Sequence, residues 1–307
     1  MEDTKVQIET HFTFNNGVKV PKVGLGSYGM NTADEIYTAV AECGYRHIDT
    51  ASYYFNEEVI GEALQKVYKE TDIKRQDLFI TSKIWGHQKK DVRGAVTESL
   101  EKLQTDYLDL YLIHWPVAYE EAEDGTKVLA KIPNHVVWAE LEKLVDEGVI
   151  KSIGVSNFNV QSLLDMLAYC RIKPVCNEVE LHPYLVQDEL VKFMKDNEIV
   201  PIAFCPLIRG GQQERRAPKD VFKLDIIQEL ATKYEKTAGQ ILLNWGLQRG
   251  HIVIPKSSKK SRLVENLDCN SFILDQEDVD KLTALNCDWR ICTTKNYDFC
   301  FNYDVFA

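Results

Sequence analysis

The chain has 307 residues, of which 45% are apolar, so it can bury a large core within the size range of α/β barrels that form one domain. Its formal net charge of -11 disfavours non-specific binding to nucleic acid or anionic membranes and favours a small-molecule partner. No segment approaches the roughly 20 apolar residues of a membrane span. The first residues lack the layout of a secretory signal, so we expect a cytoplasmic protein.

Residues 11–20 predict a β-hairpin, because two short alternating runs flank Asn16-Gly17, a dipeptide that accepts positive φ at both turn positions. After the hairpin, short β-branched or aromatic runs alternate with longer amphipathic runs. The strand-like runs are residues 22–26, 45–49, 77–83, 107–115, 150–157, 174–180, 199–206 and 251–257. Helical patterns between them include residues 32–44, 56–68, 92–104, 135–148, 160–170 and 187–197. Within the first helix, Thr32 and Glu35 fit a capping box.

Eight strands that alternate with helices predict a closed (β/α)8 TIM barrel rather than an open sheet of five or six strands. No low-complexity linker divides the chain, so we expect residues 1–307 to form a single barrel domain.

A Rossmann-type dehydrogenase is the alternative fold. Gly24, Gly26 and Gly29 spell G-x-G-x-x-G after a short strand, and Asp49 follows at the end of the next strand. However, the helix cap at Thr32 lies beyond the glycines, so a phosphate at these glycines would not lie on the helix start as that mechanism requires. We therefore prefer the barrel.

Each strand-like run after the first ends in side chains that could bind a ligand or react. They are Asp49, Lys83, His114, Ser156, Asn157, Glu178, Phe204, Lys256 and Ser257. In a TIM barrel the C-terminal ends of the strands meet at one face, and that face carries the active site. The sequence therefore predicts one site at this face. His47 lies inside its run, where we expect a hydrogen-bonded core histidine.

Several stretches resemble the aldo-keto reductases, and the aldose and aldehyde reductases in particular. The most specific is DTASYYFNEEVIGEAL, and others are ITSKIW, YLIHWP, IGVSNF, NEVELHPYL and IPKSSKKSRLVENL. The resemblance runs almost end to end. It implies an NADP-dependent oxidoreductase that reduces an aldehyde or ketone to the alcohol.

The family's catalytic tetrad corresponds to Asp49, Tyr54, Lys83 and His114. Hydride addition builds negative charge on the carbonyl oxygen, which must be protonated, and a free tyrosine is a weak acid for this task. A lysine ammonium beside the phenol would lower its pKa, and a carboxylate would keep that lysine charged. A neutral His114 could orient the carbonyl. Tyr54 is preferred to Tyr53 because it lies five residues after Asp49, as in the family.

The resemblance also implies the cofactor contacts. Ser156 and Asn157 would bind the nicotinamide carboxamide, and Phe204 would stack on the ring where tyrosine is common. Glu178 stands where the family has glutamine. An ionised glutamate accepts hydrogen bonds without donating, and its charge would favour the oxidised nicotinamide.

At the adenosine end, Lys256, Ser257 and Arg262 match the family's contacts to the 2'-phosphate, and Glu265 and Asn266 match its contacts to adenine. Two cations and a hydroxyl suit a phosphate dianion, so NADPH is preferred to NADH.

The substrate side is less specific. Tyr28, Trp85 and Trp115 match positions that line the family's substrate pocket, and the C-terminal segment, residues 289–307, shapes substrate choice in the family. We expect an aldose or other small aldehyde, acted on by a monomer or weak dimer. The loop 208–218, rich in glycine and arginine, is interpreted as a solvated loop. The alternative is a loop that closes over the cofactor pyrophosphate or recognises a phosphorylated or acidic sugar.

A second class of function is a non-catalytic barrel that binds NADPH as a redox sensor or structural protein. The intact tetrad argues against it. The spacing of the eight cysteines does not suggest a metal site, and we expect reduced thiols without a catalytic role.

Overall fold

The computed structural model describes residues 8–211 and 218–306. In this part of the chain, eight parallel strands are hydrogen-bonded in the order β12-β11-β10-β9-β6-β5-β4-β3. They are β3 (Leu25–Gly26), β4 (His47–Asp49), β5 (Phe79–Ile84), β6 (Leu110–Ile113), β9 (Ile153–Ser156), β10 (Cys176–Glu180), β11 (Val200–Phe204) and β12 (Ile252–Val253). A parallel bridge between Val23 and Val253 closes the sheet. The Gly24 amide donates to the Val253 carbonyl at 2.9 Å, so the first and last strands are joined.

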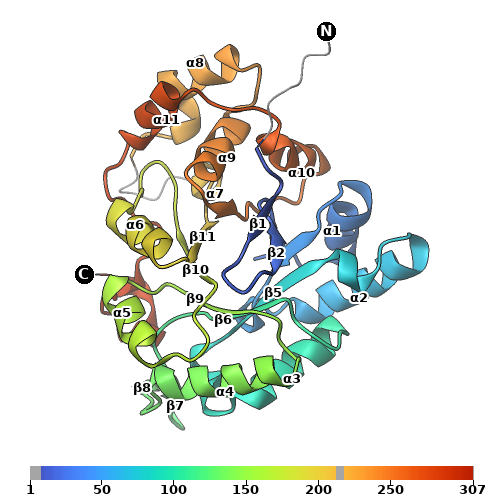
Figure 1. The fold of residues 1–307 in the computed structure, drawn as a ribbon, viewed down its shortest axis with the longest axis vertical. Helices are drawn as coiled ribbons and strands as arrows, with labels where there is room; N and C mark the ends of the chain where they lie inside the picture. Colours follow the sequence, from blue (N-terminus) through green and yellow to red (C-terminus); the bar gives the residue numbers. More distant parts are fainter. Residues whose placement is uncertain (1–7, 212–217, 307) are drawn as a thin grey trace.

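Helices surround this barrel (Figure 1). They are α1 (Ala33–Tyr37), α2 (Glu57–Glu70), α3 (Val92–Leu103), α4 (Asn134–Asp146), α5 (Val160–Tyr169), α6 (Asp188–Asp196), α7 (Ile208–Gly211), α8 (Asp225–Lys233), α9 (Ala238–Gln248), α10 (Lys260–Leu267) and α11 (Gln276–Thr283). Apolar side chains on the inner helix faces pack against the outer faces of the strands in the largest hydrophobic cluster. A smaller cluster fills the barrel interior.

The predicted α/β barrel is confirmed, and each of the eight predicted strand runs overlaps a barrel strand, although β5 extends one residue beyond its run. The predicted helix 32–44 is α1 followed by a π-helical stretch, Thr38–Glu42, and Glu35 accepts from the Thr32 amide at 3.2 Å. An antiparallel pair after β6, β7 (Tyr119–Glu121) and β8 (Lys127–Leu129), was not predicted.

The predicted N-terminal hairpin consists of β1 (His11–Thr13) and β2 (Lys19–Pro21), which lie across the barrel in Figure 1. It covers the N-terminal end of the barrel, because Phe14 belongs to the interior cluster and the Asn16 amide donates to the Lys151 carbonyl, just before β9, at 3.3 Å. Of the two predicted turn residues, only Gly17 has a positive φ, of 85°. The turn is therefore wider than a two-residue turn, and Asn16 uses its side chain to hold the hairpin on the barrel.

The Rossmann alternative is wrong, and the barrel explains its glycines differently. A Cβ at Gly24 would lie 2.7 Å from the His47 ring, and a Cβ at Gly26 would lie 2.6 Å from the Ile254 carbonyl oxygen. His47 is fully buried beside Pro21 and Thr81, with ring nitrogens 3.2 and 3.3 Å from oxygen atoms of these residues, as expected of a core histidine. Glycine is needed at positions 24 and 26 because the first strand packs so closely against His47 and Ile254 that a Cβ would not fit.

We therefore expect Gly26→Ala to destabilise the fold by about 1–3 kcal/mol, the usual range for overpacking a tight interior site. The free energy of unfolding measured in urea would show it. Gly239→Ala is the control, because in α9 an added Cβ would approach only Thr237 Oγ1, at 3.8 Å. A Gly26→Ala protein of unchanged stability would contradict this explanation.

Candidate active site

The four tetrad residues lie at the C-terminal ends of three adjacent strands. Asp49 is the last residue of β4, Lys83 lies near the end of β5, and His114 directly follows β6. Tyr54 ends a short 3-10 turn, Ser52–Tyr54, in the loop after β4. Because β4, β5 and β6 are parallel neighbours, their C-terminal ends meet at one rim of the barrel.

A buried ion pair forms the centre of this group. Lys83 Nζ donates to Asp49 Oδ1 at 2.6 Å and to the Thr50 carbonyl at 3.0 Å, and it lies 3.3 Å from Glu178 Oε1. Burial acts to lower the pKa of Lys83, but the negative charges of Asp49 and Glu178 raise it above its ordinary value. The lysine is therefore held as an ammonium inside the barrel rim.

Tyr54 and His114 lie against this ammonium. Lys83 Nζ is 5.1 Å from the centre of the Tyr54 ring. The Tyr54 and His114 rings meet edge to face with centroids 5.6 Å apart. Burial is the main cause that lowers the pKa of His114 well below its ordinary value, followed by the charge of Lys83. The imidazole is therefore neutral at neutral pH.

The predicted effect of Lys83 on Tyr54 needs a correction. Lys83 acts to lower the pKa of the phenol, as predicted, but burial acts in the opposite direction and is stronger, so the pKa of Tyr54 is raised above its ordinary value. The phenol is therefore fully protonated at neutral pH. The sequence predicted that Lys83 lies beside Tyr54. The burial of the Tyr54 hydroxyl depends on how the loop packs, which the sequence did not show.

Hydrogen bonds fix the loop that carries Tyr54. The Asn56 side chain donates to the Ser27 carbonyl at 2.8 Å and accepts from Thr50 Oγ1 at 2.8 Å, which ties this loop to the one after β3. Ser52 Oγ donates to the Lys83 carbonyl at 3.0 Å. These positioning roles were not predicted, although the residues lie within the DTASYYFNEE stretch.

The predicted nicotinamide contacts lie on the neighbouring strands. Ser156 Oγ donates to the Glu178 carbonyl at 2.9 Å, and Asn157 Nδ2 donates to the His114 carbonyl at 3.0 Å. In this structure Asn157 Oδ1 and Glu178 Oε2 are buried without a hydrogen-bond partner. Two buried acceptors without donors suit a ligand with N–H groups, such as a carboxamide. Phe204, the last residue of β11, is partly exposed nearby on the rim.

The residues predicted for the adenosine end follow β12. Lys256 is exposed, with Nζ 2.8 Å from Ser258 Oγ, and Ser257 is buried just before α10. Arg262 is exposed in the first turn of α10. Farther along α10, Glu265 is partly buried and Asn266 is buried. The loop and helix after the last strand thus place two cations and a hydroxyl at the same end of the barrel as the tetrad.

Aromatic side chains lie beside His114. Trp85 is buried, with its ring centroid 4.8 Å from that of His114, and both Trp85 and Trp115 contact Phe299 of the C-terminal segment, at 4.8 and 5.5 Å. Tyr28 is exposed and meets Tyr54 edge to face at 5.1 Å. Sequence reasoning missed Phe299, because its contact with the two tryptophans joins segments far apart in the chain.

A buried carboxylate on β10 anchors this C-terminal segment. Glu180 accepts from the amides of Ile291 and Cys292, both at 2.7 Å, and lies 2.8 Å from His182 Nε2. Burial acts to raise the pKa of Glu180, but these hydrogen bonds lower it below its ordinary value. Its role was not predicted, since the two amides that it binds lie more than a hundred residues away in the chain.

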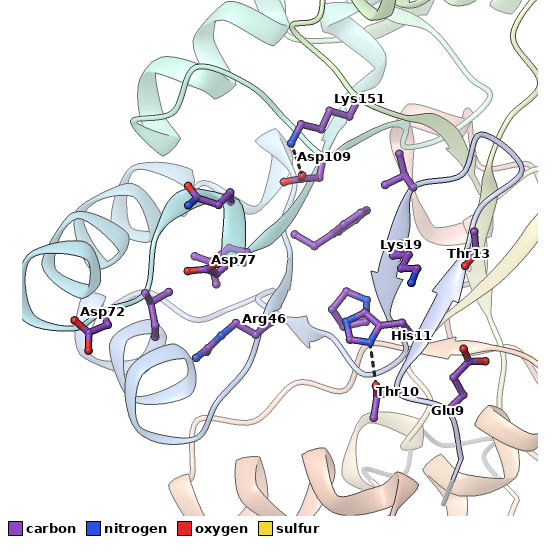
Figure 2. A pocket seen from close by; sticks show the side chains of 16 residues that line it. Glu9, Thr10, His11, Thr13, Lys19, Arg46, Asp72, Asp77, Asp109 and Lys151 are labelled. Atoms are coloured by element: carbon purple, nitrogen blue, oxygen red, sulfur yellow. Dashed lines mark hydrogen bonds and ion pairs between the residues drawn. The ribbon is translucent and has the colours of Figure 1, made fainter.

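A hollow of about 1010 Å³ lies at the opposite end of the barrel (Figure 2). Its lining includes Arg46, Asp109 and Lys151, which precede β4, β6 and β9. Asp109 is paired with Arg75 at 2.8 Å and with Lys151 at 3.5 Å. Paired charges at this face of a barrel indicate a role in stability rather than chemistry.

Other sequence predictions have structural outcomes. All eight cysteines are free thiols. Residues 212–217 of the predicted solvated loop lie outside the described residues. In the described part of the chain, no helix has both the length and the apolar character needed to cross a membrane.

Comparisons with known proteins agree with this geometry. Residues 18–287 match the model of the aldo/keto reductase family. The chain is similar to aldose reductase B of Dictyostelium discoideum, with 42% identity over 309 residues that cover 95% of this chain and 97% of that protein. It is also similar to aldose reductase C of the same organism, with 40% identity over 92% of this chain and 91% of that protein. The solved structure of aldose reductase from Schistosoma japonicum superposes with a TM-score of 0.85 at 34% identity, covering 96% and 98% of the two chains.

Proposed function

The chain belongs to the aldo/keto reductase family of carbonyl-reducing oxidoreductases, and we propose that it reduces an aldose or other small aldehyde with NADPH, with Tyr54 as the proton donor. The observation that supports this proposal most strongly is the buried Lys83–Asp49 pair at 2.6 Å, which lies against both Tyr54 and His114.

Tyr54 is suited to give its proton to a carbonyl oxygen. An acid must be protonated before it reacts, and burial keeps the phenol protonated at neutral pH. When the phenol loses its proton to the developing alkoxide, the Lys83 ammonium stabilises the phenolate that remains. Asp49 keeps that ammonium charged and in place, at 2.6 Å.

His114 orients the substrate in this proposal. Because the imidazole is neutral at neutral pH, it can donate one hydrogen bond to a carbonyl oxygen without competing as an acid. The Trp85 ring at 4.8 Å keeps the imidazole in an apolar environment. Trp115 and Phe299 complete an aromatic wall beside it, and Tyr28 contributes from the exposed edge.

Bound NADPH would supply the hydride. Asn157 Oδ1 and Glu178 Oε2, both buried and without partners, would bind the carboxamide beside Ser156, and the Phe204 ring would stack on the nicotinamide. After β12, Lys256, Ser257 and Arg262 would bind the 2'-phosphate. Glu265 and Asn266 on α10 would contact adenine. We propose that residues 1–307 act as one barrel domain.

A steady-state assay tests the activity. Aldoses, small aldehydes and ketones are offered with NADPH or NADH, and the loss of absorbance of the reduced nicotinamide is followed. We expect carbonyl-dependent oxidation of NADPH, with a lower kcat/KM for NADH and for the ketones. If NADPH binds but no carbonyl compound is reduced, the chain is a non-catalytic binding barrel and the proposal is wrong.

A further inference from the structure

Glu178 places a second carboxyl group on the Lys83 ammonium. Lys83 Nζ lies 2.6 Å from Asp49 Oδ1 and 3.3 Å from Glu178 Oε1. The exposed fractions of the three side chains are 0% for Lys83, 3% for Asp49 and 2% for Glu178. A single buried cation therefore faces two acidic groups, on the strands β4 and β10.

The charges of this cluster do not balance if both carboxyl groups are ionised. Two carboxylates that share a buried site cannot both ionise easily, so one of them retains a proton. Asp49 has the shorter contact with the ammonium, which leaves the proton on Glu178. Burial, and then the charge of Asp49, raise the pKa of Glu178 well above its ordinary value.

Three other titratable groups near Glu178 are neutral and add no charge that would favour its ionisation. Tyr54 and Cys176 are neutral at neutral pH, because burial raises the pKa of both. The neutral His114 brings no additional positive charge. The charge of Lys83 favours the ionised form of Glu178, but the closest contact of the ammonium, at 2.6 Å, is with Asp49.

A neutral carboxylic acid resembles the glutamine that the family has at this position. Both groups carry a donor and an acceptor, whereas an ionised carboxylate only accepts. Glu178 Oε2 on β10 and Asn157 Oδ1, directly after β9, are buried without partners. Since the nicotinamide ring is neutral in NADPH and positive in NADP+, a charge on Glu178 would stabilise the oxidised form alone.

We propose that Glu178 determines the choice between reduced and oxidised cofactor: its neutral form binds the carboxamide of NADPH, and its ionised form favours NADP+. This inference rests on the proposed function. NADP+ would promote loss of the Glu178 proton, so its binding would release a proton to solvent and its affinity would rise with pH. The binding of NADPH would not release that proton.

Tryptophan fluorescence titration tests the inference without turnover. The Kd values of NADP+ and NADPH are measured between about pH 6 and pH 9, a range in which buried glutamates with a raised pKa titrate. The ratio of Kd for NADPH to Kd for NADP+ is expected to rise with pH, by up to about tenfold per pH unit. The 2'-phosphate titrates in both cofactors, so the ratio cancels its contribution.

Two variants make the test specific. In Glu178→Gln the ratio is expected to be constant with pH. Glu57→Gln is the matched control, because Glu57 is also a buried glutamate but binds Ser82 Oγ, at 2.6 Å, instead of Lys83. It should keep the wild-type pH dependence. An unchanged pH dependence in Glu178→Gln would overturn the proposal.

Calorimetry of the wild-type protein in two buffers of different ionisation enthalpy provides an independent measurement. It should detect more proton release with NADP+ than with NADPH. Equal proton release with both cofactors would overturn the inference about Glu178 while leaving the reductase activity intact. If neither cofactor binds, the proposed function itself fails.

Discussion

Tyr54→Phe is expected to lower kcat for aldehyde reduction by about 10²–10⁴-fold, the usual contribution of a general acid. The substitution removes only the hydroxyl, and the ring can keep its edge-to-face contacts with Tyr28 and His114. The Kd for NADPH should therefore change little. Steady-state kinetics at saturating aldehyde gives kcat, and fluorescence titration gives Kd.

Tyr53→Phe is the matched control. Tyr53 is the neighbouring tyrosine, and its ring stacks on Trp85 at 3.9 Å, a contact that phenylalanine can keep. This variant should retain kcat near the wild-type value. If Tyr53→Phe and not Tyr54→Phe abolished turnover, the assignment of the acid would be wrong.

The second large effect concerns the 2'-phosphate. Lys256→Ala and Arg262→Ala are each expected to raise the Kd for NADPH about 10- to 100-fold, the usual loss when a charge-assisted hydrogen bond to a phosphate is removed. The Kd for NADH should not change, because NADH lacks this phosphate. Fluorescence titrations of both cofactors against each variant provide the comparison.

Lys260→Ala is the control for that pair. Lys260 also lies in α10, but it is paired with Glu42 on another element, at 2.9 Å. Its loss should leave both affinities near their wild-type values. Equal weakening of NADPH and NADH by Arg262→Ala would place Arg262 away from the 2'-phosphate.

The strands and the tetrad positions could be predicted because their signals are local. Each barrel strand is a short apolar run, and Asp49, Lys83 and His114 are polar residues directly at the ends of such runs. In a closed parallel barrel the C-terminal ends of the strands lie at one rim, so the fold alone predicts that these residues lie close together. The glycine motif was explained once the approach of Gly26 to the Ile254 carbonyl was known.

The features that could not be predicted depend on contacts between distant segments. Glu180 is a charged residue in a barrel strand and needs partners, but these are the amides of Ile291 and Cys292. The contact between Phe299 and Trp115 depends on where that anchored segment folds back. The pKa of Tyr54 depends on burial, which no local pattern gives.

In the proposed mechanism, Tyr54 protonates the carbonyl oxygen at this rim while NADPH supplies the hydride. A single-turnover experiment tests it most directly: the preformed NADPH complex is mixed with excess aldehyde, and the decay of nicotinamide fluorescence is recorded for the wild type and for Tyr54→Phe. We predict a fast decay in the wild type, with one alcohol formed per NADPH, and a decay slowed by about 10²–10⁴-fold in the variant. Equal decay rates in the two proteins would contradict the mechanism.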